Sequence, residues 1–274
     1  MRFSFRKFSL CLFLVAFLST AFLPAFAQDE ERLDIQNALK IVEIMENTYE
    51  DVQDYSVITY KQERHGGELM AREKIFTKFR KPFSVYMKWV KDDPPEHKNP
   101  NLGQEMIFEK GWNNNKIYAH LGKRSYFPAW VTSASSWVID YTALDPKGRV
   151  ATMYQRHTID EVPFGETIKR ISKAVRAGIK YPEDNVYFTN LGYKEVFGEP
   201  SGCIEGHLPG GKREAYYDDR IMVCIGLRTN MPTQIKVRND EGTVLENYRM
   251  DEITLNPGYD TEDFRPSNSE YNFQ

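Results

Sequence analysis

The residue types that most often bind metals or act as catalytic bases are scattered along this sequence. Its histidines are His65, His97, His120, His157 and His207, and no two of them lie close together. The paired histidines of an HExxH zinc motif are absent. The sequence therefore predicts neither a metal site of known motif nor a bound cofactor.

Motifs for nucleophilic and phosphoryl-transfer chemistry are also missing. No GxSxG segment offers a nucleophile elbow, and no glycine-rich loop offers a phosphate cradle. The carboxylate pairs Asp92-Asp93 and Asp218-Asp219 fall in predicted loops or at strand edges, where solvated charge is the usual outcome. We therefore expect a non-enzymatic protein. A hydrolase whose residues meet only in the folded chain is kept as a third alternative.

The first 27 residues have the three parts of a secretory signal peptide. Arg2, Arg6 and Lys7 form a basic start, an apolar run follows over residues 8–23, and Ala25-Phe26-Ala27 gives the small-x-small exit. The apolar run is shorter than the roughly 20 residues of a spanning helix, which disfavours a retained anchor. We expect cleavage after Ala27, leaving residues 28–274 as a single soluble domain in the periplasm.

The charge of the mature chain excludes some partners. Removal of residues 1–27 lowers the Lys and Arg total from 36 to 33 while Asp and Glu stay at 39, so the net charge becomes −6. An acidic chain is a poor partner for nucleic acid. An exported protein also lies outside the compartment where nucleotide-driven enzymes work.

Two cysteines remain after the signal, because Cys11 lies within its apolar core. Cys203 and Cys224 form an even pair in an exported chain, for which a disulfide is the default expectation. The alternative is a pair of buried thiols on neighbouring strands. Their spacing is too wide for a redox CxxC motif.

Two segments have the apolar spacing of amphipathic helices. The first follows Asp34, a suitable amino-terminal cap, and the second follows Pro163, which suits a first helical position, and stops at Gly178. The polar face of the second helix is basic. The apolar stripes comprise Ile35, Ala38, Leu39, Val42, Met45 and Tyr49 in the first helix, and Phe164, Ile168, Ile171 and Val175 in the second.

Most of the remaining chain alternates with the period of two that is typical of strands. A His65-Gly66-Gly67-Glu68 turn separates the first two strands, and Lys81-Pro82 separates the next two. We expect α+β architecture: about nine to eleven mostly antiparallel strands in a curled sheet, with two or three helices packed on its dry side. The later strands are expected at 105–109, 116–121, 185–190, 193–197, 202–207, 214–225, 233–238 and 243–255.

The alternation places one set of apolar side chains on a shared face opposite the first helix. An ordinary packed core is the alternative, since these residue types fill most cores. The set comprises Val57, Leu69, Ile75, Phe79, Phe83, Val85, Met87 and Trp89 on the strands, with Val42 and Met45 on the helix.

An irregular stretch between the strands is rich in aromatic residues. It contains Tyr126, Phe127 and Trp130, with Trp137 just beyond. Aromatic side chains with a polar end suit a boundary between water and an apolar phase, so the stretch is a candidate lid or membrane-touching tip. A loop pinned to the sheet by its aromatic side chains is the alternative.

Two segments carry a family resemblance. KPFSVYMKW at 81–89, after the Gly-Gly hairpin, and VLENYRMDEITLNPGYDTEDF at 244–264 resemble an exported bacterial domain family of unknown function. That family is similar in layout to LolA/LolB-like lipoprotein carriers and RseB-type envelope sensors, with which the chain shares the element order and a closing Asn256 to Phe264 pattern.

The resemblance implies a fold and a kind of ligand. In the carriers an incomplete antiparallel barrel, lidded by helices, holds acyl chains on its concave side. The shared apolar face would then line a cavity for a lipid, a lipoprotein acyl chain or another apolar ligand, and the partner would be that ligand or an acylated protein.

The alternative from another class is an envelope interaction or sensor module with a filled core. Basic rows on the strand at 72–80 and on the second helix are candidate contacts for an envelope protein or an anionic membrane surface, although such rows are usually just solvated.

Overall fold

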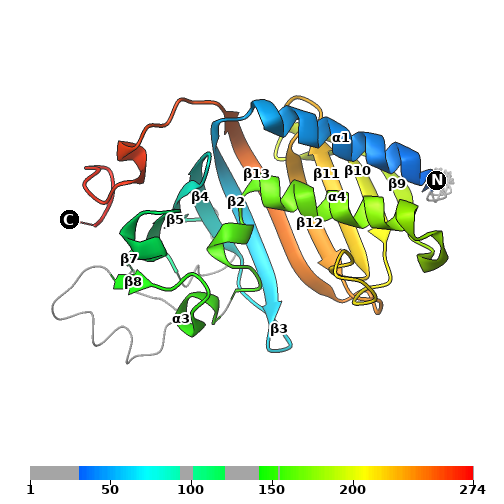
Figure 1. Cartoon of the computed structure of the whole chain (residues 1–274), viewed down its shortest axis with the longest axis horizontal. Helices are drawn as coiled ribbons and strands as arrows, with labels where there is room; N and C mark the ends of the chain where they lie inside the picture. The colour runs from blue at the N-terminus through cyan, green and yellow to red at the C-terminus, as the bar shows by residue number, and fades with distance from the viewer. Residues whose placement is uncertain (1–30, 93–100, 121–141, 154, 274) are drawn as a thin grey trace, which may run out of the picture.

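One antiparallel sheet organises the chain. The computed structural model describes residues 31–92, 101–120, 142–153 and 155–273. Within these residues the sheet has thirteen strands, and its end strands β1 and β8 are not paired with each other, so the curved sheet stays open (Figure 1). The strands are β1 (Glu31–Leu33), β2 (Asp54–His65), β3 (Glu68–Leu69), β4 (Glu73–Arg80), β5 (Ser84–Val90), β6 (Glu105–Glu109), β7 (Ile117–His120), β8 (Thr142–Leu144), β9 (Tyr187–Val196), β10 (Glu199–His207), β11 (Arg220–Gly226), β12 (Pro232–Arg238) and β13 (Val244–Leu255).

The first long strand, β2, and the last strand, β13, are neighbours in the middle of the sheet. The order is β1-β9-β10-β11-β12-β13-β2-β4-β5-β6-β7-β8, with β3 beside β2. Strand β13 pairs with β2 although nearly 200 residues separate them, and Thr254 lies opposite Ser56. Side chains from distant parts of the sequence therefore meet on the concave face at this junction.

The helices lie on one face of the sheet. The α-helices of the described residues are α1 (Ile35–Asp51), α3 (Arg149–Thr152) and α4 (Phe164–Lys180). Figure 1 shows α1 and α4 side by side across the half of the sheet formed by β9 to β13. The predicted α+β architecture, an open curved sheet with helices on its concave side, is confirmed.

The ends of both long helices follow from local chemistry. The Asp34 carboxylate caps α1 by accepting a hydrogen bond of 2.9 Å from the backbone N–H of Gln36, as predicted. Pro163 precedes α4 rather than occupying its first position. Gly178 does not end the helix. A β-carbon there would lie 2.8 Å from the Val186 side chain, so glycine at this position permits close packing inside the last turn.

Two predicted strand assignments need correction. The two strands predicted within 185–197 are one strand, β9. The pairing of β9 with β10 is irregular next to Gly192, which adopts a φ of 72°. The strand predicted over 214–225 begins only at Arg220, because the preceding residues form turns after Leu208. The very short strands β1 and β3 carry too few residues to show a periodic pattern.

The two faces of the sheet have separate cores. The concave face, α1 and α4 share a large apolar core that includes Val42, Met45, Val85 and Val175. On the convex face, the C-terminal segment packs through Phe264, Tyr271 and Phe273 against Tyr86 and Ile107. The rings of Tyr86 and Tyr271 stack with their centroids 3.9 Å apart. The convex side of β5 and β6 is therefore covered by the chain itself.

The predicted disulfide between Cys203 and Cys224 is present. The two cysteines occupy directly opposed positions on β10 and β11, with their Cα atoms 4.1 Å apart. They pack with Val196 and Met222 in a small cluster separate from the concave core. The disulfide thus links β10 and β11 covalently on the convex side of the sheet.

None of the helices within the described ranges is long and apolar enough to cross a membrane.

Replacing both cysteines, as Cys203→Ser with Cys224→Ser, is expected to lower the free energy of unfolding. The sequence separation of 21 residues gives a loss of about 3 kcal/mol in the chain-entropy model. Urea denaturation under non-reducing conditions measures the loss. Reduced wild-type protein is the matched control and should match the double variant, whereas equal stability of oxidised wild type and variant would contradict a structural role.

Candidate functional site

A cavity of about 140 Å³ lies on the concave face of the sheet. Its floor comes from β2, β4 to β7 and β11 to β13, and its cover comes from α4 and the residues that lead into that helix. Apolar side chains line most of it, including Val57, Ile75, Met87, Ile235, Val237 and Met250. The sheet therefore offers an apolar space that its own helices leave incompletely filled.

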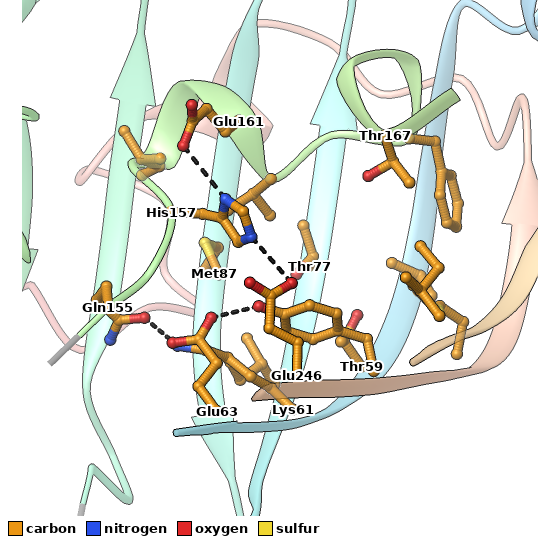
Figure 2. Close-up of a pocket in the computed structure, with 18 of the residues that line it drawn as sticks. Thr59, Lys61, Glu63, Thr77, Met87, Gln155, His157, Glu161, Thr167 and Glu246 are labelled. Carbon is orange, nitrogen blue, oxygen red and sulfur yellow. Dashed lines mark hydrogen bonds and ion pairs between the residues drawn. The ribbon is translucent and has the colours of Figure 1, made fainter. Parts of the chain in front are cut away.

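Charged side chains gather at one end of this cavity, as Figure 2 shows. Glu63 on β2 and Glu246 on β13 are directly opposed partners in the two strands, and their exposed fractions are 3% and 1%. Two buried carboxylates in opposed positions repel each other unless cations lie close to both. The segment before α4 supplies such cations.

Glu246 has three partners, Arg156 and His157 from that segment and Tyr217 from the turns between β10 and β11. Its carboxylate accepts hydrogen bonds from Arg156 Nε at 2.6 Å and from the Tyr217 hydroxyl at 2.5 Å, and its second oxygen lies 3.2 Å from His157 Nε2. Burial acts to raise the pKa of Glu246, but the hydrogen bond and charge of His157, with Tyr217 and Arg156, lower it to about 2. The carboxylate is therefore held ionised in a buried position.

The negative charge of Glu63 is compensated by a different set of partners. Lys61 Nζ lies 3.4 Å from Glu63 and 3.5 Å from Glu73, and the Tyr248 hydroxyl and the backbone N–H of Arg156 both donate to Glu63. Burial acts to lower the pKa of Lys61, but the charges of the two glutamates raise it. Glu63 and Glu246 thus each have their own set of donors.

His157 links the cover of the cavity to its floor. Its Nδ1 lies 3.3 Å from Glu161, and its Nε2 lies 3.2 Å from Glu246 (Figure 2). Glu161 also accepts from the backbone N–H of Thr158 in a capping box, which fixes the short turn that carries both residues. The side-chain oxygen of Gln155 accepts a hydrogen bond from Lys61 on β2 (Figure 2). Gln155, Arg156 and His157 therefore attach three successive positions to the sheet.

The residues predicted from the sequence to face a cavity occupy three kinds of position. Val57, Ile75, Met87 and Trp89 line the cavity. Val42, Met45, Phe79 and Val85 are buried in the surrounding core, and Phe83 packs against it partly buried. Leu69 lies in β3, away from the cavity, with 41% of its surface exposed.

The aromatic candidates for a lid or tip, Tyr126, Phe127, Trp130 and Trp137, lie outside the described residues. In the part of the chain that is described, no group of three or more His, Cys, Asp or Glu residues has a geometry that could hold a metal ion.

The sequence analysis does not predict the charged end of the cavity, although the strand pattern contains a signal for it. The alternation that assigns Val57 and Thr59 to the concave face continues to Lys61 and Glu63, which places two charges on an otherwise apolar face. Glu246, Tyr248 and Met250 alternate in the same way on β13. The pairing of these strands, which the sequence does not reveal, makes the two runs one site.

A family model described as a protein of unknown function, DUF1571, matches residues 52–273. The chain belongs to that family. This confirms the expected membership in a domain family of unknown function. A search of curated proteins finds no match.

Solved structures with a similar arrangement come from several bacteria. The Mycobacterium tuberculosis lipoprotein LppX is 11% identical, with a TM-score of 0.45 over 82% of this chain and 98% of LppX. The Pseudomonas aeruginosa MucA/MucB complex gives 10% identity and a TM-score of 0.40 over 84% of this chain and 60% of that one. The LolA superfamily protein NE2245 from Nitrosomonas europaea is 7% identical, with a TM-score of 0.31 over 83% of this chain and 97% of NE2245. Function must be inferred from the cavity of this chain.

The variant Glu246→Gln is expected to lower the free energy of unfolding at pH 7 by roughly 3 kcal/mol, because it removes the buried carboxylate that pairs with Arg156 at 2.6 Å and accepts from Tyr217. Since folding lowers the pKa of Glu246 from 4.5 to about 2, its contribution is complete above pH 4.5 and is lost as the pH falls toward 2. Urea denaturation from pH 7 to pH 3 measures both effects.

The matched control is Glu166→Gln. Glu166 pairs with Lys169 on the exposed surface of α4, where an ion pair contributes about 0.5 kcal/mol or less. An equally small loss in Glu246→Gln, with an unchanged acid profile, would show that the buried network does not hold the cover in place.

Proposed function

We propose that this protein is a non-enzymatic binding or carrier protein that holds an apolar ligand in the cavity between its sheet and α4. The observation that supports this most strongly is the apolar lining of a space that the helices leave open. Burial of an acyl chain there supplies about 0.8 kcal/mol per methylene, which gives firm but reversible binding. The ligand would be a lipid, the acyl chain of a lipoprotein or a similar molecule.

The size of the cavity bears on how binding proceeds. At about 140 Å³ it resembles engineered apolar cavities of roughly 150 Å³ that admit a single benzene. A longer chain needs more room, and α4 with the residues before it forms the cover. Ligand entry would therefore move α4 outward from the sheet, and release to an acceptor would return it.

The cellular setting of the proposal follows from the N-terminal pattern. Residues 1–27 have the composition of a signal peptide, so the protein would act in the periplasm. A soluble holder of apolar ligands has an obvious task there, since lipids and acylated proteins cannot cross an aqueous compartment unaided.

A cavity-filling substitution tests the proposal. Val237→Phe adds a ring to the cavity floor, so the affinity for a neutral apolar dye, N-phenylnaphthylamine, should fall about tenfold or more. Gln234→Phe is the matched control on the same strand, because Gln234 lies on the opposite face beside Asn247. Dye fluorescence measures affinity, and thermal unfolding checks that both variants fold.

Saturable binding to wild type and Gln234→Phe, with loss in folded Val237→Phe, is the expected outcome. Equal binding to all three proteins would place the dye elsewhere, and no binding to wild type would mean that the space does not accept apolar molecules. Either of these two results would contradict the proposed function.

A further inference from the structure

One arginine at the cavity differs from the other cations around it. Arg170, on the second turn of α4, lines the cavity and lies 4.8 Å over the ring of Tyr217. Its Nη1 is 3.4 Å from His157 Nε2. Among the described residues, no carboxylate lies within 4.0 Å of its guanidinium, which is the ion-pair limit met by its neighbours.

The neighbouring cations are already neutralised. Lys61 is shared by Glu63 and Glu73, and Arg156 pairs with Glu246 at 2.6 Å and with Asp218 at 3.3 Å. On α4 itself, Lys169 pairs with Glu166 and Arg176 pairs with Glu46.

The carboxylates near Arg170 also have other hydrogen-bond and ion-pair partners. Glu246 already accepts from Arg156 and Tyr217 and faces His157, while Glu161 faces His157 and accepts from the backbone of Thr158. The aromatic ring beneath Arg170 holds its guanidinium in place without neutralising its charge. Among the described residues, the Arg170 guanidinium is thus without an ion-pair partner where the apolar lining meets the charged end.

This arrangement matches a ligand that has one charged end. The apolar lining accepts a hydrocarbon chain, while the planar guanidinium presents donors in the fork geometry that suits carboxylate and phosphate oxygens. Thr167, one turn earlier on α4, also lines the cavity. Its hydroxyl adds a second donor for an oxyanion on the same helix.

We propose that Arg170 is the head-group anchor of the cavity and that its ligand is an amphiphile with an apolar chain and an oxyanion head, either a carboxylate or a phosphate. This inference rests on the proposed function and narrows it to one class of ligand. It also assigns to α4 a role in recognition, because the helix that covers the chain carries the residue that binds the head.

Calorimetric titration with three ligands of equal chain length tests the proposal: decanoate, decyl phosphate and neutral decanol, at pH 7 and low salt. Wild type should bind at least one of the two anions about tenfold or more tightly than decanol, as a charge-assisted hydrogen bond provides. Tighter binding of decanoate would identify a carboxylate head, and tighter binding of decyl phosphate a phosphate head.

Three variants test whether Arg170 causes this preference for anions. Arg170→Gln should remove the preference for the anions while retaining the affinity for decanol, whereas Lys173→Gln, which removes an exposed charge one turn later on α4, should leave the preference unchanged. Arg170→Lys should keep part of it, and thermal unfolding confirms that each variant folds.

The other outcomes separate the two proposals. Equal binding of all three ligands to wild type, or a preference that persists in Arg170→Gln, would overturn the role of Arg170 while leaving the apolar cavity intact. Binding of none of the three would overturn the proposed function and this inference with it.

Discussion

The opposition of Glu63 and Glu246 is the constraint on which the site depends. Pairing of β2 with β13 places these buried carboxylates in opposed positions on the concave face, where unbalanced charge would oppose folding. Arg156 and His157 bring the compensating donors from the segment before α4. Glu63 also has Lys61 and Tyr248 of the sheet itself, whereas Glu246 finds both of its cationic partners in the cover, so its burial depends on the cover being docked.

The same docking explains why the cavity has two chemically different ends. At the end where the cover is fastened, the lining must be polar, because carboxylates and their partners meet there. Elsewhere α4 packs on the sheet mainly through apolar side chains such as Phe164 and Ile171, and apolar contacts do not define one spacing as strictly as hydrogen bonds do. An apolar space and a charged end thus arise from the same packing of the cover on the sheet.

Much of the fold could be predicted from the sequence, whereas the charged site could not. Apolar spacing reveals α1, α4 and the alternating strands, since burial of one face leaves a local pattern. The meeting of Glu63, His157 and Glu246 leaves no such local pattern, because His157 and Glu246 are 89 positions apart in the sequence and only strand pairing joins Glu246 to Glu63. Lys61 and Glu63 were the available signal: two charges where alternation predicts apolar contacts.

Methyl NMR of the methionines can locate a bound ligand, because their side chains lie on both faces of the sheet. Met87, Met106 and Met250 line the cavity, while Met222 lies on the convex face beside the disulfide. With decanoate present, the account predicts shifts and ligand-to-methyl nuclear Overhauser effects at the three cavity methionines and none at Met222. Effects at Met222 alone, or at no methionine under saturating ligand, would contradict an apolar ligand held between the sheet and α4.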